Sequence, residues 1–323
     1  MRRVYILGAG ASAGYENGQC GIRPPTARKF FTVVKALLEK GDLHRDRFSR
    51  LWEFLEKFYR VKPDGLDTSS LDIEEVLTMI DVAGKKPVVR RELLDLIVLT
   101  LNRIIYGNPC PHHRRLLDSL GPDDAIITFN WDLLLDNLVA QGGPNYGANM
   151  LEHVEETAWT AGRGRSAPLV LKVHGSLNWM TCHKCRKSFA HILEGKIAAQ
   201  YHAGQSVPCR HCNSATDPLI IPPTLLKNYK HPVIKAVWNE AARVLRHADE
   251  ITVVGYSLPL TDFKAKWLFM EASANRAVPL RNLTVVDLCA DGLKDKYQRV
   301  FCLPEVRTVT GGIRDVPCDI SSP

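Results

Sequence analysis

The chain opens with the stretch Val4-Tyr5-Ile6-Leu7-Gly8-Ala9-Gly10-Ala11-Ser12, in which an apolar run passes directly into a glycine loop. A short apolar, β-forming run that ends in glycine predicts a buried strand followed by a tight turn. Glycines in such a turn let the backbone approach a diphosphate, whose charge is met by backbone N–H groups. The candidate phosphate-binding residues are Gly8, Ala9, Gly10 and Ser12. A plain tight turn explains the pattern equally well, because Ala13 stands where the dinucleotide fingerprint has its third glycine.

Short apolar runs alternate with helical patterns along the rest of the chain. The expected strands cover residues 4–7, 125–129, 169–173, 219–221, 251–254, 283–287 and 306–309. The expected helices cover residues 26–41, 44–60, 72–82, 88–106, 132–140, 232–247 and 262–275. Apolar strands that alternate with helices predict an α/β fold, here a Rossmann-like, doubly wound parallel sheet with both faces covered.

Two stretches interrupt this alternation, and we expect them to be insertions into the main domain. Residues 42–118 predict a helical insertion, and residues 180–216 predict a small zinc-ribbon module. The Rossmann-like domain would then combine residues 1–41, 119–179 and 217–310. Residues 311–323 are polar and end in proline, which predicts a loosely ordered tail.

Four cysteines form two Cys-x-x-Cys pairs within the second insertion. Cys182 and Cys185 make one pair, Cys209 and Cys212 make the other, and 23 residues separate them. Four thiolates with this spacing predict a closed, tetrahedral, structural Zn²⁺ site. Two histidines lie inside the pairs, His183 and His211, and are the alternative ligands; the matched spacing favours the four cysteines.

Composition is that of an ordinary globular protein. Hydrophobic residues make up 45% of the 323 residues and charged residues 24%. The net charge of +7 permits an anionic ligand, but the basic residues are scattered, so we do not expect direct nucleic-acid binding. No stretch approaches the roughly 20 apolar residues of a membrane helix, and residues 4–7 are too few for a signal-peptide core. We expect a reducing cytoplasm, where paired cysteines bind metal.

Polar side chains follow two of the predicted strands. Thr128, Asn130 and Asp132 come at the end of strand 125–129, and His174 comes at the end of strand 169–173. Ligands of open α/β sheets bind at this edge. Asn130 offers a donor and an acceptor for a ribose hydroxyl or a water, whereas Asp132 is equally well explained as a helix N-cap. His174 is a candidate proton acceptor, with a purely structural histidine as the alternative.

Two later strands end in further candidates. Gly255, Tyr256 and Ser257 follow strand 251–254, and their backbone would let a nucleotide lie close. Asp287 ends strand 283–287, where a carboxylate can hold a ribose diol. An ordinary loop explains each of these equally well.

Taken together, and in this order, the motifs resemble the sirtuin superfamily. The resemblance covers nearly the whole chain: the phosphate loop at Gly8–Ser12, the Asn-x-Asp motif at Asn130 and Asp132, the His-Gly step at His174, the four-cysteine zinc ribbon, the Gly-x-Ser loop at Gly255 and Ser257, and the late ribose contact at Asp287. The family's fold and its use of NAD⁺ are therefore expected here.

The departures from the family favour one branch of it. Protein deacylases carry Gly-Ile-Pro-Asp-Phe-Arg after the glycine loop, whereas residues 21–26 read Gly-Ile-Arg-Pro-Pro-Thr. The stretches 71–75, 172–179 and 254–259 instead resemble a sirtuin-like branch of bacterial antiphage defence proteins. Members of that branch hydrolyse NAD⁺, some as oligomers or with an ATPase partner. The intact zinc ribbon, in contrast, resembles the deacylases.

The resemblance implies an NAD⁺ glycohydrolase with Asn130, His174 and Asp132 as catalytic residues. Binding of NAD⁺ would involve Gly8, Ala9, Gly10, Ser12, Thr128, Gly255, Tyr256, Ser257 and Asp287. The alternatives are an NAD-dependent lysine deacylase and a non-catalytic sensor of NAD⁺ or ADP-ribose. Because a toxic NADase must be restrained, we expect a homo-oligomer, or control by a partner ATPase or sensor protein.

Overall fold

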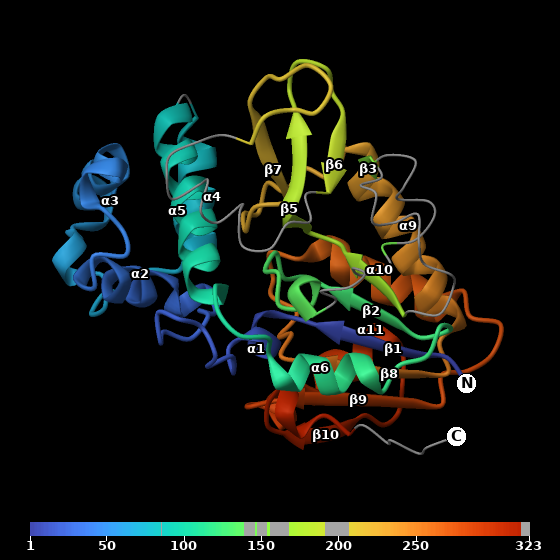
Figure 1. Cartoon of the computed structure of the whole chain (residues 1–323). Coiled ribbons are helices and arrows are strands. Elements are labelled where there is room, and N and C mark those ends of the chain that lie inside the picture. The colour runs from blue at the N-terminus through green and yellow to red at the C-terminus, as the bar shows by residue number, and fades with distance from the viewer. Residues whose placement is uncertain (85, 139–145, 147–153, 156–167, 191–206, 318–323) are drawn as a thin grey trace.

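Six parallel strands form the central sheet of the molecule (Figure 1). The structure, a computed structural model, describes residues 1–84, 86–138, 146, 154–155, 168–190 and 207–317. The strands are β1 (Arg3–Leu7), β2 (Ala125–Thr128), β4 (Leu169–Lys172), β8 (Glu250–Val254), β9 (Asn282–Asp287) and β10 (Arg307–Thr310). Every pairing among them is parallel. The predicted α/β, Rossmann-like fold is confirmed.

The order of the strands contains one reversal. Across the sheet the order is β10-β9-β8-β1-β2-β4. The chain therefore runs outward from β1 to β4, returns to place β8 beside β1, and continues outward on the other side. This is the order of dinucleotide-binding folds, in which ligands bind beyond the carboxyl ends of the strands at the reversal. In this chain the reversal lies between β1 and β8.

Alternate side chains of the strands enter two different cores. On β1, Val4 and Ile6 pack with helices α9 (Pro232–His247), α10 (Phe263–Ala274) and α11 (Ala290–Phe301). Tyr5 and Leu7 face the opposite way, toward helix α6 (Pro111–Asp118). Burial on both faces explains why β1 is a continuous apolar run without polar positions.

A separate helical region covers one end of the sheet. It comprises α2 (Phe30–Glu39), α3 (Ser49–Tyr59), α4 (Ile73–Ala83) and α5 (Pro87–Ile105), which share an apolar core and lie together at the left of Figure 1. The predicted helices of this region are confirmed to within a few residues, with 3₁₀ turns at Ala27–Lys29 and Arg45–Phe48. None of the described helices is long and apolar enough to cross a membrane. The division of the chain into domains stays a prediction.

A small second sheet carries the cysteine pairs. Its order is β3-β6-β5-β7, formed by β3 (Val154–Glu155), β6 (Ser188–Ala190), β5 (Gly175–Cys182) and β7 (Thr216–Ile220). β5 pairs antiparallel with both β6 and β7. The strand predicted at 219–221 is therefore real, but it belongs to this sheet and not to the parallel one.

The helix predicted at 132–140 is wrong over its described part. Residues 132–135 form bends and turns, followed by a 3₁₀ turn at Asp136–Leu138. The cause is the buried ammonium of Lys172, which donates to the Asp132 carbonyl at 2.7 Å and to Asp136 Oδ2 at 2.8 Å. These two bonds tie the segment to β4, and Asp132 Oδ1 accepts from the Leu134 N–H at 3.1 Å, so the chain follows a turn here in place of the helix that the apolar spacing predicts.

The loops that follow β1 and β8 generate a test of the fold. Gly255 has φ +60°, and a Cβ there would lie 2.3 Å from the Ala11 nitrogen. Gly292, in α11, has no atom within 4 Å of the same position. We expect Gly255→Ala to lower the free energy of unfolding by about 2 kcal/mol or more, from backbone strain and overlap. Gly292→Ala should leave it unchanged or raise it by up to about 1 kcal/mol. Urea titration of both variants measures this; equal effects would contradict the packing described.

Candidate functional site

Two glycine loops pack against each other at the reversal of the strand order. The Gly10 N–H donates to the Gly255 carbonyl at 2.9 Å, and the Gly8 N–H donates to the Val254 carbonyl at 3.0 Å. A Cβ on Gly8 or on Gly10 would lie 2.7 Å or less from the backbone at 255–256. The glycines are therefore required by this backbone contact. Ala9, the first residue of the short helix α1 (Ala9–Ser12), is exposed, so a diphosphate would meet the chain at that point.

A hydrogen-bond network joins the first loop to the end of β2. The Asn130 amide donates to the Gly8 carbonyl at 2.8 Å and to Ser12 Oγ at 2.9 Å. Ser12 Oγ in turn donates to Asp132 Oδ2 at 2.7 Å. The backbone N–H of Asn130 donates to Thr128 Oγ1 at 3.1 Å. Since Thr128 is only 3% exposed, its visible role is to hold Asn130 in place.

The carboxylate of Asp132 accepts two hydrogen bonds. Its Oδ2 accepts from Ser12, and its Oδ1 accepts from the Leu134 N–H at 3.1 Å. The carboxylate caps a turn, in place of the helix N-cap that the sequence suggested. One negative charge is thereby fixed beside Asn130 at the carboxyl edge of the sheet.

His174 is buried just beyond the end of β4. It is 5% exposed and its ring meets Phe129 edge to face, with centroids 5.1 Å apart. Burial lowers the pKa of the imidazole to about 4, so the ring is neutral at physiological pH. Its Nε2 has no hydrogen-bond partner among the described residues and lies 3.7 Å from Asp262 Oδ1.

Asp262 and Lys227 belong to this site, and the sequence analysis missed them. Lys227 Nζ donates to Asp262 Oδ1 and to the Thr261 carbonyl. The Tyr256 hydroxyl donates to Asp262 Oδ2 at 2.7 Å. Burial would raise the pKa of the Asp262 carboxyl, but His174 and Lys227 hold it below its usual value. In the sequence, Asp262 looks like the N-cap of a helix, so the pattern gave no sign that it belongs to the site of His174.

The helical region contributes Glu74, from α4, to the same cluster. The Thr261 hydroxyl donates to Glu74 Oε2 at 2.6 Å, and burial raises the pKa of this carboxyl. A second contact joins α4 to the loop before α9, where the Leu225 N–H donates to Thr78 Oγ1 at 3.1 Å. The only sequence signal for Glu74 was its place in the stretch 71–75, which the resemblance singled out.

The structure brings most, but not all, of the predicted site residues together. Ser257 is exposed, and its carbonyl accepts from Lys296 Nζ at 2.8 Å. Asp287 is at the same edge of the sheet, where its Oδ1 accepts from the Cys289 N–H at 2.9 Å. Among the described residues, no hydrogen bond or ion pair joins Asp287 to Asn130 or His174. Asp287 ends β9, which β8 and β1 separate from β2 in the sheet. This position suits a contact to a distant part of a long ligand.

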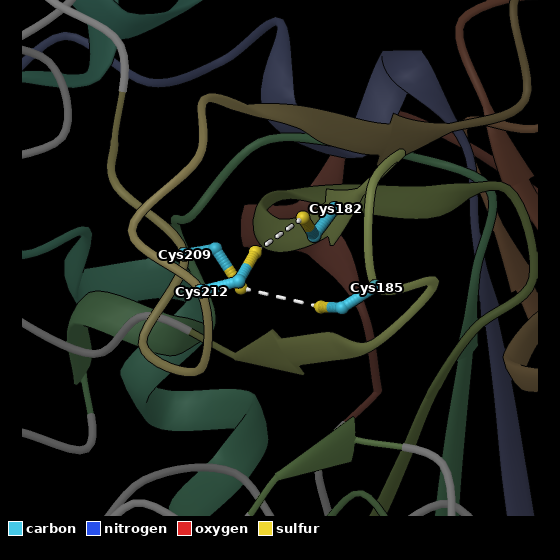
Figure 2. Close-up of side chains that lie close together, drawn as sticks. All are labelled: Cys182, Cys185, Cys209 and Cys212. Carbon is cyan, nitrogen blue, oxygen red and sulfur yellow. Dashed lines mark hydrogen bonds between the residues drawn. The ribbon is translucent and has the colours of Figure 1, made fainter.

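The four predicted cysteines converge on one point (Figure 2). Cys182 Sγ and Cys212 Sγ are 3.5 Å apart, as are Cys185 Sγ and Cys209 Sγ, and all four sulfurs lie within 4.8 Å of one another. A tetrahedral zinc with bonds of about 2.3 Å separates its sulfurs by about 3.8 Å. The donor set and its spacing fit zinc.

The two cysteine pairs have matching backbone turns. The Cys182 carbonyl accepts from the Arg186 N–H at 2.9 Å, and the Cys209 carbonyl accepts from the Asn213 N–H at 2.8 Å. Arg186 and Asn213 both have positive φ, 60° and 55°. The rival ligands turn away: His183 contacts Asp217 at 2.8 Å, and His211 contacts Lys187 at 3.1 Å. Four sulfur ligands would close the site, so its metal would be structural.

Metal removal tests this cluster. Cys182 and Cys209 belong to the same apolar core as the helices α2–α5, so loss of the metal should loosen that core as well. We expect elemental analysis to find one zinc per chain, and Cys212→Ser or chelation to lower the melting temperature. Cys289→Ser, at an exposed cysteine, is the matched control. A chain without metal and with unchanged melting would contradict the assignment.

Two buried histidines predict a loss of stability in acid. The pKa values of His174 and His113 are both lowered from 6.5 to about 4, mainly by burial. Unfolding exposes both rings, which then bind protons that the folded state excludes. The contribution of the two histidines to the free energy of unfolding should be fully present above pH 6.5. It should fall by about 3 kcal/mol per histidine as the pH drops to 4. Urea titrations across this range measure the slope; His174→Gln should reduce it, whereas His44→Gln, at an exposed site, should not.

Comparison with known proteins places the chain near one group of structures. No family model and no curated protein matches it. It is similar to a structure from a study of the mechanism and regulation of Sir2 enzymes, with 19% identity, a TM-score of 0.49, and 97% of this chain and 87% of that chain covered. It is also similar to a mutant Sir2 homologue bound to 2′-O-acetyl ADP ribose, with 18% identity, a TM-score of 0.49, and 98% and 88% covered. A complex of a Sir2 homologue with NAD gives 15% identity, a TM-score of 0.47, and 97% and 85% covered.

Proposed function

We propose that this chain is a sirtuin-like NAD⁺ glycohydrolase, which converts NAD⁺ and water to nicotinamide, ADP-ribose and a proton. The observation that carries the proposal is the arrangement at the reversal between β1 and β8. The glycine loop, Asn130 and His174 stand on the ends of β1, β2 and β4, at the edge where nucleotides bind in this fold class. The order of these motifs in the sequence, which resembles the sirtuin superfamily, is the independent support.

The substrate would span the edge of the sheet. Its diphosphate would lie at the stretch Gly8–Ser12, beside Gly255 and Ser257. The adenosine ribose would reach Asp287, whose half-buried carboxylate could accept from a 2′,3′-diol. The nicotinamide ribose would then lie toward Asn130 and His174.

The reaction breaks the bond between nicotinamide and ribose through an oxocarbenium-like state. Nicotinamide leaves with the bonding electrons, and a water oxygen forms the new bond to the ribose carbon. The Asn130 amide is fixed through its nitrogen by Gly8 and Ser12, so its oxygen would orient the ribose or the water. The Asp132 carboxylate would stabilise the developing positive charge. His174 would accept the proton at Nε2, which suits a neutral imidazole.

Hydrolysis is favoured over lysine deacylation by two observations. The Asp-Phe-Arg segment of the family's deacylases is missing from residues 21–26. The aromatic wall beside His174 is also occupied already: Lys264 Nζ lies 4.7 Å from the Tyr229 ring centre and 5.0 Å from the Trp238 ring centre. An acyl-lysine would need to pass a cation held by two rings.

We place this activity in antiviral defence, on the strength of the resemblance alone. Depletion of NAD⁺ in the cytoplasm would then be the effect on an infected cell. Restraint of such an enzyme would come from assembly into a homo-oligomer or from a partner ATPase or sensor protein. Structural zinc would take no part in the chemistry.

Turnover of NAD⁺ tests the proposal. We expect the purified, zinc-loaded protein to release nicotinamide and ADP-ribose without any peptide, at a rate that rises with protein concentration if assembly activates it. Substitution of the base or of the orienting amide should lower kcat by about 100-fold or more. The variants are His174→Ala and Asn130→Ala, and their turnover of NAD⁺ is measured by chromatography of the products. His44→Ala and Asn137→Ala, at exposed positions, are the matched controls.

An acetyl-lysine peptide separates the two enzymatic alternatives. Turnover only with peptide, with an O-acetylated ADP-ribose as product, would make the protein a deacylase. Full turnover by His174→Ala would remove His174 from the catalytic residues. Binding of NAD⁺ with no turnover across a range of protein concentrations would favour the sensor.

A further inference from the structure

We propose that Asp262 is a positioning residue for His174, and that Lys227 competes with the protonated histidine for the same carboxylate oxygen. After His174 has taken a proton from water or ribose, the Asp262 carboxylate would stabilise the resulting imidazolium. The positive charge of Lys227 would make this protonation less favourable. The inference rests on the proposed function, because it takes His174 to be the base.

The geometry at His174 assigns a role to Nε2. The ring is buried, and Nε2 has no hydrogen-bond partner among the described residues. Nε2 lies 3.7 Å from Asp262 Oδ1. We take the neutral ring to carry its proton on Nδ1, which leaves the lone pair on Nε2. Once Nε2 is protonated, its N–H faces a carboxylate.

The Asp262 carboxylate is held by two donors, one on each oxygen, which fix its orientation toward the ring. Its Oδ2 accepts from the Tyr256 hydroxyl at 2.7 Å, and Tyr256 is itself stacked on Phe129 at 4.0 Å with the planes 10° apart. Its Oδ1 accepts from Lys227 Nζ, and that ammonium is also bound to the Thr261 carbonyl at 3.0 Å. The side chains of Asp262 and Lys227 are 5% and 4% exposed. Asp262 Oδ1 is thus shared: it accepts from Lys227 Nζ and also faces His174 Nε2.

The charges around His174 come from three elements. Asp262, at the start of α10, favours the protonated ring, and Lys227, in the loop before α9, opposes it. Lys264, the second residue of α10, adds a second cation over the Tyr229 and Trp238 rings. Glu74, on α4, attracts Lys227 and repels Asp262. The hydroxyls of Tyr229 and Tyr256 have pKa values raised by burial and stay neutral.

Helix α4 connects this balance to the helical region. Glu74 binds the Thr261 hydroxyl, next to Asp262, and Thr78 binds the backbone at Leu225, two residues before Lys227. One helix therefore holds both segments that carry the competing charges. A movement of α4 would act on the Lys227–Asp262 contact.

Titration of the His174 imidazole by NMR tests the proposal independently of turnover. In histidine-labelled protein, with the signal assigned from His174→Gln, Asp262→Asn should lower the His174 pKa and Lys227→Met should raise it. In NAD⁺ hydrolysis, Asp262→Asn should lower kcat by about 10-fold or more with little change in KM. The acid limb of kcat/KM should move to lower pH in Asp262→Asn and to higher pH in Lys227→Met. Asp295→Asn and Lys230→Met, both exposed, are the matched controls.

A second pair of variants covers the case in which Lys227→Met fails to fold, because it leaves a buried carboxylate without its cation. Glu74→Gln keeps the Thr261 hydrogen bond and removes a negative charge, so it should lower the His174 pKa; Glu75→Gln, on the exposed side of α4, should not. An unchanged His174 pKa in Asp262→Asn would overturn the proposal. Titrations that move as stated, in a protein that never hydrolyses NAD⁺, would support the coupling and refute the proposed function.

Discussion

The contact between the backbones of two loops is the constraint on which the site depends. Gly8 and Gly10 follow β1, Gly255 follows β8, and none of the three has room for a Cβ. If the loops separated, the Gly8 carbonyl would leave Asn130, and Tyr256 would carry Asp262 away from His174. A single close approach at the reversal of the strand order thus positions both halves of the candidate site.

The parallel sheet supplies the positions of the side chains, and the packing of other elements supplies their electrostatic environment. Asn130 and His174 come two residues after the ends of adjacent strands, so the register places both at the same edge of the sheet. Their partners come from farther away: Asp262 from the start of α10, Lys227 from a loop, and Glu74 from the helical region. The helical region is therefore part of the site.

The sequence predicted what depends on local pattern and missed what depends on packing. Buried parallel strands must be continuous apolar runs, so their positions and the polar residues at their ends were readable. Asp262 and Lys227 stand in a helix start and an irregular loop, where charged residues are usually solvated. The helix predicted at 132–140 had the right apolar spacing, but a buried lysine 40 residues away binds the Asp132 carbonyl. No local pattern carries that information.

The cost of burial favours a role for the charged cluster in the proposed reaction over a role in stability. A buried ion pair repays its desolvation only with good geometry, and apolar residues of similar size often stabilise a fold as well or better. Asp262 and Lys227 are both almost inaccessible, and they stand beside a neutral histidine whose Nε2 has no partner among the described residues. An unpaired buried acceptor is a further cost. Such an arrangement is expected where an incoming proton completes it, because protonation of Nε2 turns the unpaired acceptor into a donor that faces Asp262.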